Sequence, residues 1–214
     1  MRLPSKTIER ELFRNGYKRL IAVDEVGMGC LAGPVVVCAV SISPAFYRKF
    51  YRRLAWLRDS KLLTSRRRDV FAKELLTNPH IRAKISFCHP RTIDRLNIYQ
   101  AARLAMRRAI GKLETKSNKA KAIVLVDGKN RIEGLRTNQL PIVKGDRRVF
   151  AIACASIVAK VFRDRMMARY AKRFPGYAFD RHKGYSTKLH RARLAALGPS
   201  AIHRRSFAPV ARIV

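Results

Sequence analysis

The sequence predicts an α/β fold, in which a mixed β-sheet is flanked by helices and followed by a helical C-terminal portion. Short apolar runs of strand length alternate with longer segments in which apolar residues recur at three- and four-residue spacing. Turn-forming pairs that contain glycine or proline separate these segments. With 214 residues and 48% hydrophobic content, the chain can bury one substantial core. We therefore expect a single compact unit.

The first half of the chain contains three predicted strands and one predicted helix. Residues 20–23 form an apolar run that ends in charged residues, and residues 35–42 form a longer β-branched run; a glycine-rich turn joins these two strands. Residues 65–76 combine helix formers with one apolar face, which predicts a helix. An Asn-Pro pair interrupts this pattern, and the alternation over residues 81–88 predicts another strand.

The middle of the chain predicts a helix that is followed by a buried strand. Over residues 97–113, small and apolar residues recur on one side and basic residues on the other, which is typical of an amphipathic helix with a basic outer face. A basic linker at residues 114–121 leads into an apolar run at residues 122–126, which stops at Asp127. We expect a buried strand that ends in a carboxylate.

The last third of the chain is predicted to be largely helical. Residues 140–143 predict a short strand, and residues 149–172 predict a long helix that a Pro-Gly pair stops. Residues 182–185 predict a turn, and residues 187–197 predict a further helix. A Gly-Pro break then precedes a basic tail.

The charge balance favours a polyanionic partner. The chain has 47 Lys and Arg residues against 14 Asp and Glu residues, a formal net charge of +33. No apolar run approaches the ~20 residues that span a bilayer, so we expect no membrane partner. The first 18 residues lack the apolar core of a signal peptide. Because the four cysteines form no Cys-x-x-Cys pair and have no histidine at zinc-finger spacing, we expect reduced thiols in a cytoplasmic protein.

Four carboxylates are conspicuous in a chain that contains so few acids. Asp24 and Glu25 end one predicted strand, Asp127 ends another, and Asp146 precedes a predicted helix. Carboxylates at the ends of neighbouring strands can converge, and their oxygens suit hard cations such as Mg²⁺ or Mn²⁺. A pair of such ions about 3.5–4 Å apart can activate water and stabilise a leaving oxygen. These four residues are therefore the predicted metal-binding and catalytic residues.

Turn and cap roles are the alternative for these acids, since Asp is common before glycine and near helix starts. Asp164 is a rival ligand on the long predicted helix. We expect it to be structural, with the neighbouring Arg163 and Arg165 as its charge partners. The five histidines lack metal-ligand spacing, and we expect them to be structural or close to substrate, not catalytic.

Seven blocks, in the expected order, resemble the ribonuclease HII family and cover about residues 20–210. One block alone would be a weak signal, whereas seven in order are specific. They are residues 24–36 (DEVGMGCLAGPVV), 59–63 (DSKLL), 126–128 (VDG), 144–146 (KGD), 155–161 (ASIVAKV), 182–185 (HKGY) and 203–207 (HRRSF).

The resemblance implies a ribonuclease H-like fold with a catalytic domain at residues 1–175 and a C-terminal helical, substrate-contacting extension at residues 176–214. It implies that Asp24, Glu25 and Asp127 bind two Mg²⁺ or Mn²⁺ ions, Asp24 being the best candidate to bridge them, and that Asp146 matches the family's fourth active-site carboxylate. The implied reaction is hydrolysis of the RNA strand of RNA/DNA hybrids, or of duplex DNA that contains ribonucleotides, which leaves a 3′-hydroxyl and a 5′-phosphate.

The resemblance also implies substrate contacts outside the acids. Tyr185 matches a tyrosine that packs on a deoxyribose, and the turn Gly27-Met28-Gly29 can approach a ribose 2′-hydroxyl closely because glycine has no side chain. The chain departs from the family pattern here, because an arginine is usual at Met28 and a proline at Cys30. Methionine cannot pair with phosphate, so incision at a single embedded ribonucleotide is less well supported than cleavage of longer hybrids.

Two lysines are predicted phosphate contacts, with solvated surface lysines as the alternative. They are Lys61 and Lys144, and Lys61 must act alone because the family's second lysine is replaced by Leu62. Basic side chains at residues 103–121 and 183–205 are predicted to flank a duplex without reading its sequence. Replication clamps and other protein partners are not readable from the sequence, and we expect a monomer.

Two other functions are compatible with part of this pattern. A non-catalytic basic RNA-binding protein would also be small and cationic, but it would not need four acids at strand ends. Another ribonuclease H-like nuclease, acting on DNA, could use a similar arrangement of carboxylates. The glycine turn and Tyr185 favour a hybrid substrate, by resemblance more than by physical argument.

Overall fold

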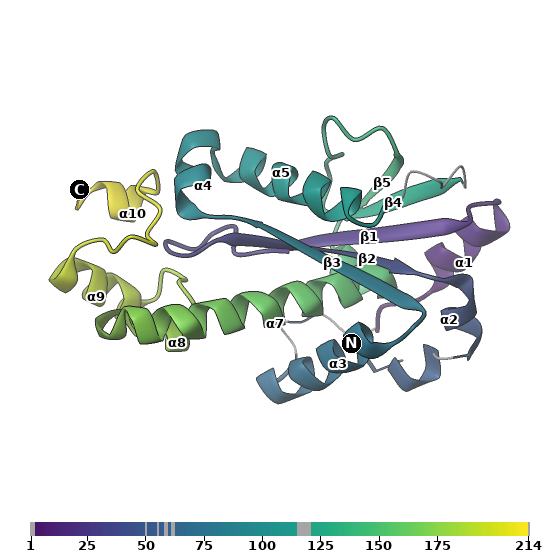
Figure 1. Cartoon of the computed structure of the whole chain (residues 1–214), viewed down its shortest axis with the longest axis horizontal. Helices are drawn as coiled ribbons and strands as arrows, with labels where there is room; N and C mark the ends of the chain where they lie inside the picture. The colour runs from purple at the N-terminus through teal and green to yellow at the C-terminus, as the bar shows by residue number, and fades with distance from the viewer. Residues whose placement is uncertain are drawn as a thin grey trace.

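The structure, a computed structural model, describes residues 3–49, 51–54, 56–57, 60, 63–114 and 121–213. Its centre is a five-stranded sheet with the strand order β3-β2-β1-β4-β5 (Figure 1). The strands are β1 (Arg19–Val26), β2 (Val35–Ile42), β3 (Ile81–Cys88), β4 (Ala122–Asp127) and β5 (Asn138–Ile142). The predicted mixed sheet is confirmed: β1, β2 and β3 pair antiparallel, whereas β4 is parallel to both β1 and β5.

Helices cover both faces of the sheet (Figure 1). On one face lie α4 (Pro90–Leu96) and α5 (Ile98–Gly111); on the other lie α3 (Ser65–Thr77) and the long α7 (Phe150–Arg173). The remaining helical elements are α1 (Thr7–Arg14), α2 (Pro44–Lys49), η1 (Tyr51–Leu54), α6 (Gly145–Arg148), η3 (Pro175–Tyr177), α8 (Phe179–His182), α9 (Lys188–Leu197) and α10 (Ala208–Ala211).

The alternation of strand side chains divides the core into two layers. Ile21 and Val23 of β1 pack in the cluster that contains the small face of α5, whereas Ala22 packs in the cluster that contains α7. Successive side chains of a strand point to opposite faces, and both faces are apolar here. For this reason β1 and β2 have nearly continuous apolar sequences, as buried strands require.

Helix α1 is anchored to the start of α7 by a buried carboxyl group. The Oε1 atom of Glu9 accepts a hydrogen bond from the Ala151 amide at 3.0 Å and from the Tyr47 hydroxyl at 3.4 Å. Amides in the first turn of a helix have no partner within that helix, so Glu9 satisfies one of them. Burial raises the pKa of Glu9 to about 7.

Most predicted elements are present, with shifted ends. β1 continues through the charged residues to Val26, and β5 begins two residues before the predicted strand. The short helices α1, α2, α4, α6, α8 and α10, together with η1 and η3, were not predicted. Most of the predicted basic linker, together with Lys61 and Leu62, lies outside the described residues.

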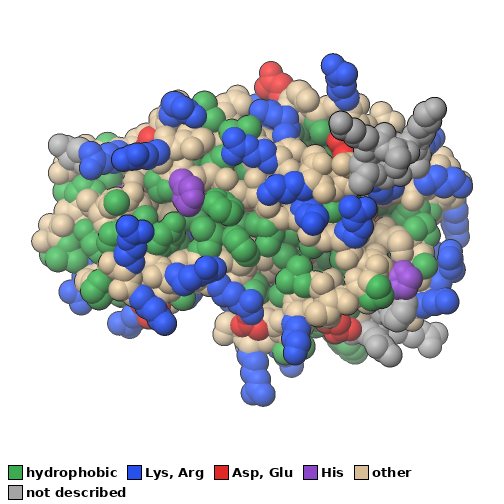
Figure 2. Space-filling model, viewed as in Figure 1, with side chains coloured by type: hydrophobic (Ala, Val, Ile, Leu, Met, Phe, Trp, Pro, Cys, Tyr) green, Lys and Arg blue, Asp and Glu red, His purple; other side chains and the backbone are tan. Residues whose placement is uncertain are grey.

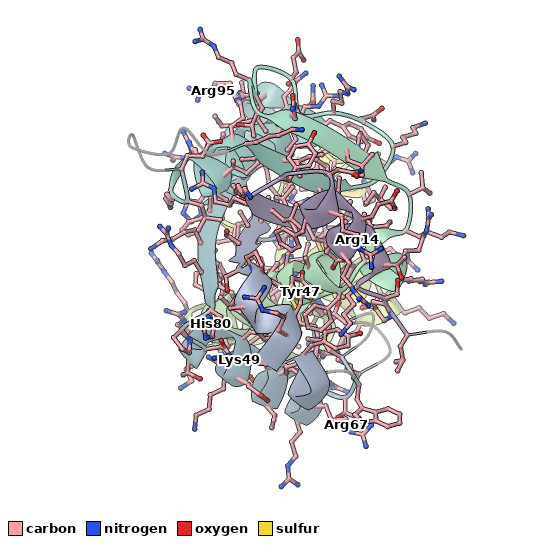
Figure 3. The ribbon with its side chains drawn as sticks, turned by 90° about the vertical axis from the view of Figure 1, so that its right-hand side faces the viewer. Arg14, Tyr47, Lys49, Arg67, His80 and Arg95 are labelled. Carbon is pink, nitrogen blue, oxygen red and sulfur yellow. The ribbon has the colours of Figure 1, made fainter. Side chains whose placement is uncertain are left out.

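In the part of the chain that the structure describes, no helix is long and apolar enough to cross a membrane. Basic side chains are spread over the face shown in Figure 2, with few acids between them. Seen from the end of the molecule in Figure 3, Arg14, Arg67 and Arg95 lie on different sides of the view. The positive charge is therefore spread over several elements and is not confined to a tail.

Candidate active site

A cavity of about 630 Å³ opens where β1 and β4 end. Eight of the predicted site residues line it: Asp24, Glu25, Gly27, Met28, Gly29, Asp127, Asp146 and Tyr185. Four polar residues that were not predicted as site residues line it as well: Ser60, Arg68, Ser156 and Lys160. The cavity thus combines acids, a glycine turn, an aromatic ring and two cations.

The two aspartates at the strand ends meet because of strand register. Val23 and Val126 are paired in the parallel ladder of β1 and β4, and both belong to the α5 side of the core. Since side chains alternate along a strand, the next residues, Asp24 and Asp127, project towards the α7 side. Equal register on neighbouring parallel strands makes them adjacent, although 103 positions separate them in the sequence.

Asp146 reaches the cavity from the first turn of α6. Lys144 precedes this helix in the left-handed region, with φ 55°, and the Gly145 amide donates to Asp127 Oδ1 at 2.7 Å. A Cβ atom on Gly145 would lie 2.6 Å from Cδ1 of Ile152, so a larger residue here would displace the Ile152 side chain. One peptide therefore ties α6 to the end of β4.

The acids repel one another, and Asp24 is at their centre. Burial raises the pKa of Asp24 well above its usual range, and the charges of Glu25, Asp127 and Asp146 raise it further. A hydrogen bond from Ser156 acts in the opposite direction. The Glu25 amide also donates to Asp24 Oδ1 at 2.8 Å. A cation in the cavity would remove this repulsion and restore the ionised form.

The donor set suits a hard divalent cation, because carboxylate oxygens are the ligands that Mg²⁺ and Mn²⁺ prefer. Among the described residues, no group of three or more His, Cys, Asp or Glu side chains is already arranged to hold a metal ion. One oxygen of Asp24 and one of Asp127 are engaged by backbone amides. Metal binding would therefore require these carboxylates to reorient.

Tyr185 stands at the rim of the cavity with 38% of its surface exposed. Lys160 Nζ lies 5.5 Å and Arg163 Cζ 5.7 Å from the centre of its ring. Burial of the hydroxyl raises the pKa of Tyr185 to about 12. A β-bridge between Tyr185 and Cys30 joins this rim to the loop of residues 27–34, hereafter the glycine loop.

Met28, which stands where the family usually has arginine, is half-buried. Its side chain packs against the apolar cluster of the α5 side, and it also lines a second cavity of about 230 Å³ there, with Tyr99 and Met106. Charged residues, among them Arg103 and Arg131, line the same second cavity. Met28 extends the core towards the active-site cavity.

The ion pairs of Asp164 and the position of Arg204 differ from those predicted from the sequence. Asp164 is paired not with its neighbours Arg163 and Arg165 but with Lys160 at 2.8 Å and Arg68 at 3.7 Å. Helical neighbours in space are three or four residues apart, and adjacent residues point in different directions. Arg204, included among the basic residues predicted to flank a duplex, is fully buried.

Lys144 is exposed and does not line the cavity, so its phosphate contact stays a prediction. Of the polar cavity residues that were not predicted, Ser156 and Lys160 are the two that a sequence pattern could have indicated. They lie four residues apart in the apolar first half of α7, and this spacing puts both on the same face. The Ser156 hydroxyl also contacts that of Ser60 at 3.0 Å.

The three histidines of the C-terminal region form a buried cluster behind Tyr185. The rings of His182 and His190 stack with centroids 4.1 Å apart, and Nε2 of His190 lies 3.0 Å from Nε2 of His203. Burial lowers the pKa of His190 and His203 to about 4. Their rings are therefore neutral at pH 7, and each faces protein groups instead of the cavity.

A mixed sheet with carboxylates at the ends of two adjacent parallel strands, in a strongly basic chain, defines a nuclease of the ribonuclease H class. Residues 21–210 match the family model described as ribonuclease HII. The chain belongs to the ribonuclease HII family, and this membership makes it an endoribonuclease that hydrolyses phosphodiester bonds.

Known proteins agree with this assignment. A ribonuclease HII of Carboxydothermus hydrogenoformans is 42% identical over 203 residues, which are 95% of this chain and 83% of that protein. The crystal structure of ribonuclease H2 from Pyrococcus horikoshii shares the fold, with a TM-score of 0.70 and 22% identity over 91% of this chain and 96% of that one. Bst-RNase HIII in complex with Mn²⁺ has a TM-score of 0.70 and 18% identity, over 92% of this chain and 70% of that one.

Proposed function

We propose that this endoribonuclease cleaves the RNA strand of RNA/DNA hybrids with two divalent metal ions, and leaves a 3′-hydroxyl and a 5′-phosphate. The observation that carries the proposal is the convergence of Asp24, Glu25, Asp127 and Asp146 on one cavity, in a chain with 33 excess positive charges. Such a concentration of negative charge is unfavourable unless cations compensate it. A basic surround and an acidic centre suit a phosphate backbone that approaches together with metal ions.

The acids are proposed as the metal ligands. The charges of Glu25, Asp127 and Asp146 all act on Asp24, and this central position makes it the best candidate to bridge two ions. When bound, the ions would supply an activated water and stabilise the leaving oxygen of the phosphodiester. Either Mg²⁺ or Mn²⁺ fits carboxylate oxygens, and the related Bst-RNase HIII is described in complex with Mn²⁺.

The cations at the cavity are proposed to hold the phosphates next to the cleaved bond. Lys160 is fixed by its ion pair with Asp164, and Arg68 donates to the carbonyls of Ser60 and Leu63 at 2.9 and 2.7 Å. Fixed cations contact phosphate at a lower entropic cost than mobile ones. Lys61 and Lys144 remain proposed phosphate contacts outside this pair.

Tyr185 and the glycine loop are proposed to recognise the sugars. The exposed ring of Tyr185 offers a flat apolar surface for a deoxyribose, and the backbone of Gly27, Met28 and Gly29 can approach a 2′-hydroxyl. Met28 packs on the α5 side and, as an uncharged side chain, adds no cation to this contact. We therefore propose longer hybrids as the preferred substrates and weaker incision at single embedded ribonucleotides.

Residues 176–214 are proposed to act as a substrate-contacting extension of a single compact unit, with residues 1–175 as the catalytic part. Two β-bridges support this proposal, since Cys30 pairs with Tyr185 and Ala32 with His203. We also propose that the enzyme acts as a monomer in the cytoplasm, where its four buried free thiols would stay reduced.

The decisive assay offers three duplexes of one sequence: an RNA/DNA hybrid, a DNA duplex with one ribonucleotide, and DNA alone, each with Mg²⁺ or Mn²⁺. We expect cleavage of the hybrid, slower cleavage at the single ribonucleotide and none of the DNA. Cleavage of DNA alone would show a different ribonuclease H-like nuclease. The Asp24→Asn variant should bind the hybrid but not cut it; if wild-type protein binds without cutting any duplex, the chain is a binding protein.

A further inference from the structure

Two buried arginines form hydrogen bonds to the backbone of the glycine loop. Arg163 of α7 and Arg204 of the C-terminal segment are fully buried, and neither forms a salt bridge within the described residues. Burial of a cation without a counter-ion is costly unless its N–H groups are satisfied. Burial, together with the nearby charge of Arg163, lowers the pKa of Arg204 to about 10. The desolvation of two buried guanidinium groups is unfavourable, so a role other than packing is expected for them.

Both guanidinium groups donate their hydrogen bonds to backbone carbonyls around the active site. Arg204 donates to the carbonyls of Gly27, Met28 and Gly33 at 2.6, 2.8 and 3.0 Å. Arg163 donates to those of Ala32, Pro34 and Lys183 at 3.1, 3.0 and 2.9 Å. Five of these six carbonyls belong to the glycine loop, and the sixth lies two residues before Tyr185.

These bonds fix the direction of two amides. All peptide bonds of the described residues are trans, and in a trans peptide the C=O and the following N–H point in opposite directions. Because Arg204 holds the carbonyls of Gly27 and Met28, the amides of Met28 and Gly29 point away from Arg204. Both residues line the active-site cavity, and neither amide donates to another described residue.

The sequence around the loop accommodates this arrangement. Gly27 has φ +95°, and a Cβ atom there would lie 2.3 Å from Nε of Arg163. The segment that carries Arg204 is itself fixed, because Asp94 of α4 accepts from the amides of Arg205 and Ser206 at 3.1 and 2.9 Å. The guanidinium groups are thus held between rigid elements and can impose one loop conformation.

We propose that Arg163 and Arg204 are positioning residues that turn the amides of Met28 and Gly29 outward to donate to the 2′-hydroxyl oxygen of the cleaved strand. The inference rests on the proposed function and deepens it, because it names the groups that set ribose recognition. Neither arginine touches the substrate. Each acts through the backbone of the glycine loop, so the expected defect is in sugar discrimination.

The test compares Arg204→Lys and Arg163→Lys with wild-type protein. Lysine keeps the charge but cannot serve three carbonyls in a fixed plane. The matched control is Arg165→Lys, on the same helix as Arg163 but exposed and paired with Asp69. Each protein receives the RNA/DNA hybrid and the same hybrid with one deoxyribonucleotide at the mapped cleavage site. The ratio of the two kcat/KM values measures recognition of a single 2′-hydroxyl.

We expect the ratio to fall about tenfold or more in Arg204→Lys and Arg163→Lys, because a small displacement of the donors weakens an oriented contact. It should not change in Arg165→Lys. A merely destabilised enzyme would lose activity on both substrates equally and keep its ratio. An unchanged ratio in a folded Arg204→Lys variant, as judged by its thermal unfolding, would overturn the inference.

A second measurement covers the case in which both variants fail to fold. In ¹⁵N-labelled Asp24→Asn protein, the amide resonances of Met28 and Gly29 should shift with the hybrid and not with DNA of the same sequence. If neither amide responds to the ribose strand, the inference is wrong. If wild-type protein cuts no hybrid, the proposed function fails independently of the response of these amides.

Discussion

At the scale of single residues, Asp24 is a site where activity and stability are opposed. It is buried beside three other carboxylates, which raise its pKa, and only Ser156 and the Glu25 amide stabilise its charge. The folded state therefore binds a proton at Asp24 more tightly than the unfolded state does. At pH 7 this residue destabilises the fold unless cations are present.

The variant Asp24→Asn should be more stable than the wild-type protein in metal-free buffer. The asparagine oxygen can still accept from the Glu25 amide, while the buried negative charge is gone. We expect an increase of about 1–2 kcal/mol in the free energy of unfolding, together with loss of cleavage. Urea unfolding in the presence of a chelator measures the first effect. A lower unfolding midpoint in the variant would contradict this account of the acid cluster.

The glycine loop allows a matched pair of substitutions. Gly27→Ala would put Cβ against Arg163 and Pro34 at a φ of +95°, whereas Cβ on Gly29 meets nothing within 4 Å. Gly27→Ala should lower the free energy of unfolding by about 2 kcal/mol or more, and Gly29→Ala should change it by less than about 0.5 kcal/mol. Thermal unfolding of both variants tests this contrast. Equal effects would mean that the loop relaxes around the extra methyl group.

The sequence located the acids but not their supporting residues, for physical reasons. An acid that ends an apolar run is visible because hydrophobicity changes abruptly, as at Asp24 and Asp127. Ser156 and Lys160 share one face of α7, but two polar residues at four-residue spacing do not distinguish a site from an ordinary solvent-facing position. Arg204 is in a basic stretch, and its neighbour Arg205 is exposed. The burial of Arg204 depends on contacts more than 170 positions away.

At the scale of elements, the turn that carries Tyr185 is held by neutral histidines with defined tautomers. Nδ1 of His182 accepts from the Gly184 amide, so its Nε2 donates to the Tyr177 carbonyl. In the same way, Nδ1 of His203 accepts from the Ser200 amide at 2.9 Å, so its Nε2 donates to His190. A further proton on any of these rings would remove an acceptor.

These pKa shifts predict a fall in stability at acid pH. The folded-state pKa of His190 and of His203 is about 4, below the unfolded value of 6.5. The unfolded state therefore binds more protons between these values, and its advantage grows as the pH falls through this window. Glu9, with a raised pKa of about 7, has the opposite effect over part of the range.

The variant Glu9→Gln separates the two contributions. It removes the opposing carboxyl group, so its free energy of unfolding should fall more steeply between pH 6.5 and 4 than that of wild-type protein. Urea unfolding at several pH values, compared within each protein, provides the measurement. The raised pKa of Asp24 acts in the same direction as that of Glu9, so both proteins are compared in the Asp24→Asn background. A free energy of unfolding that stays constant or rises towards acid pH in Asp24→Asn/Glu9→Gln would show that the histidines are not buried as neutral rings.

Long periodic elements were predictable, whereas short helices were not. α3, α5, α7 and α9 each have enough turns for spacing or stop signals to be recognised, as with the Pro-Gly pair that follows α7. α6 and α8 have four residues each, and left-handed residues at Lys144 and Ala178 start them. Helices this short have little stability of their own. Their conformation comes from tertiary contacts that local sequence does not record.

At the scale of the whole molecule, the excess of 33 positive charges should control binding. Affinity of Asp24→Asn for the hybrid should fall about a hundredfold or more between 50 and 200 mM salt, because phosphate contacts release counter-ions. Fluorescence anisotropy at a series of salt concentrations gives the slope. A DNA duplex of equal length should show a similar slope, since backbone contacts do not read sequence. A nearly flat dependence for both duplexes would contradict a phosphate-dominated interface.

The mixed sheet with flanking helices could be predicted from the sequence, whereas the strand order and the contact between the C-terminal segment and the glycine loop could not. Strands and helices in order indicated a mixed sheet, whereas the strand order β3-β2-β1-β4-β5 depends on long-range pairing. The C-terminal segment returns to the glycine loop, where the Arg204 amide donates to the Leu31 carbonyl at 2.8 Å. Such a contact leaves no periodic pattern. The family resemblance, more than local physics, indicated that these segments belong to one site.

The four buried cysteines allow local unfolding of the chain to be followed by thiol modification. Cys30 lies in the glycine loop, Cys38 in β2, Cys88 at the end of β3 and Cys154 in α7. Burial raises the pKa of each thiol, which suppresses the reactive thiolate. An alkylating reagent should therefore modify each cysteine only when its surroundings come apart. The four labelling rates would map, without any added probe, which part of the molecule loosens first.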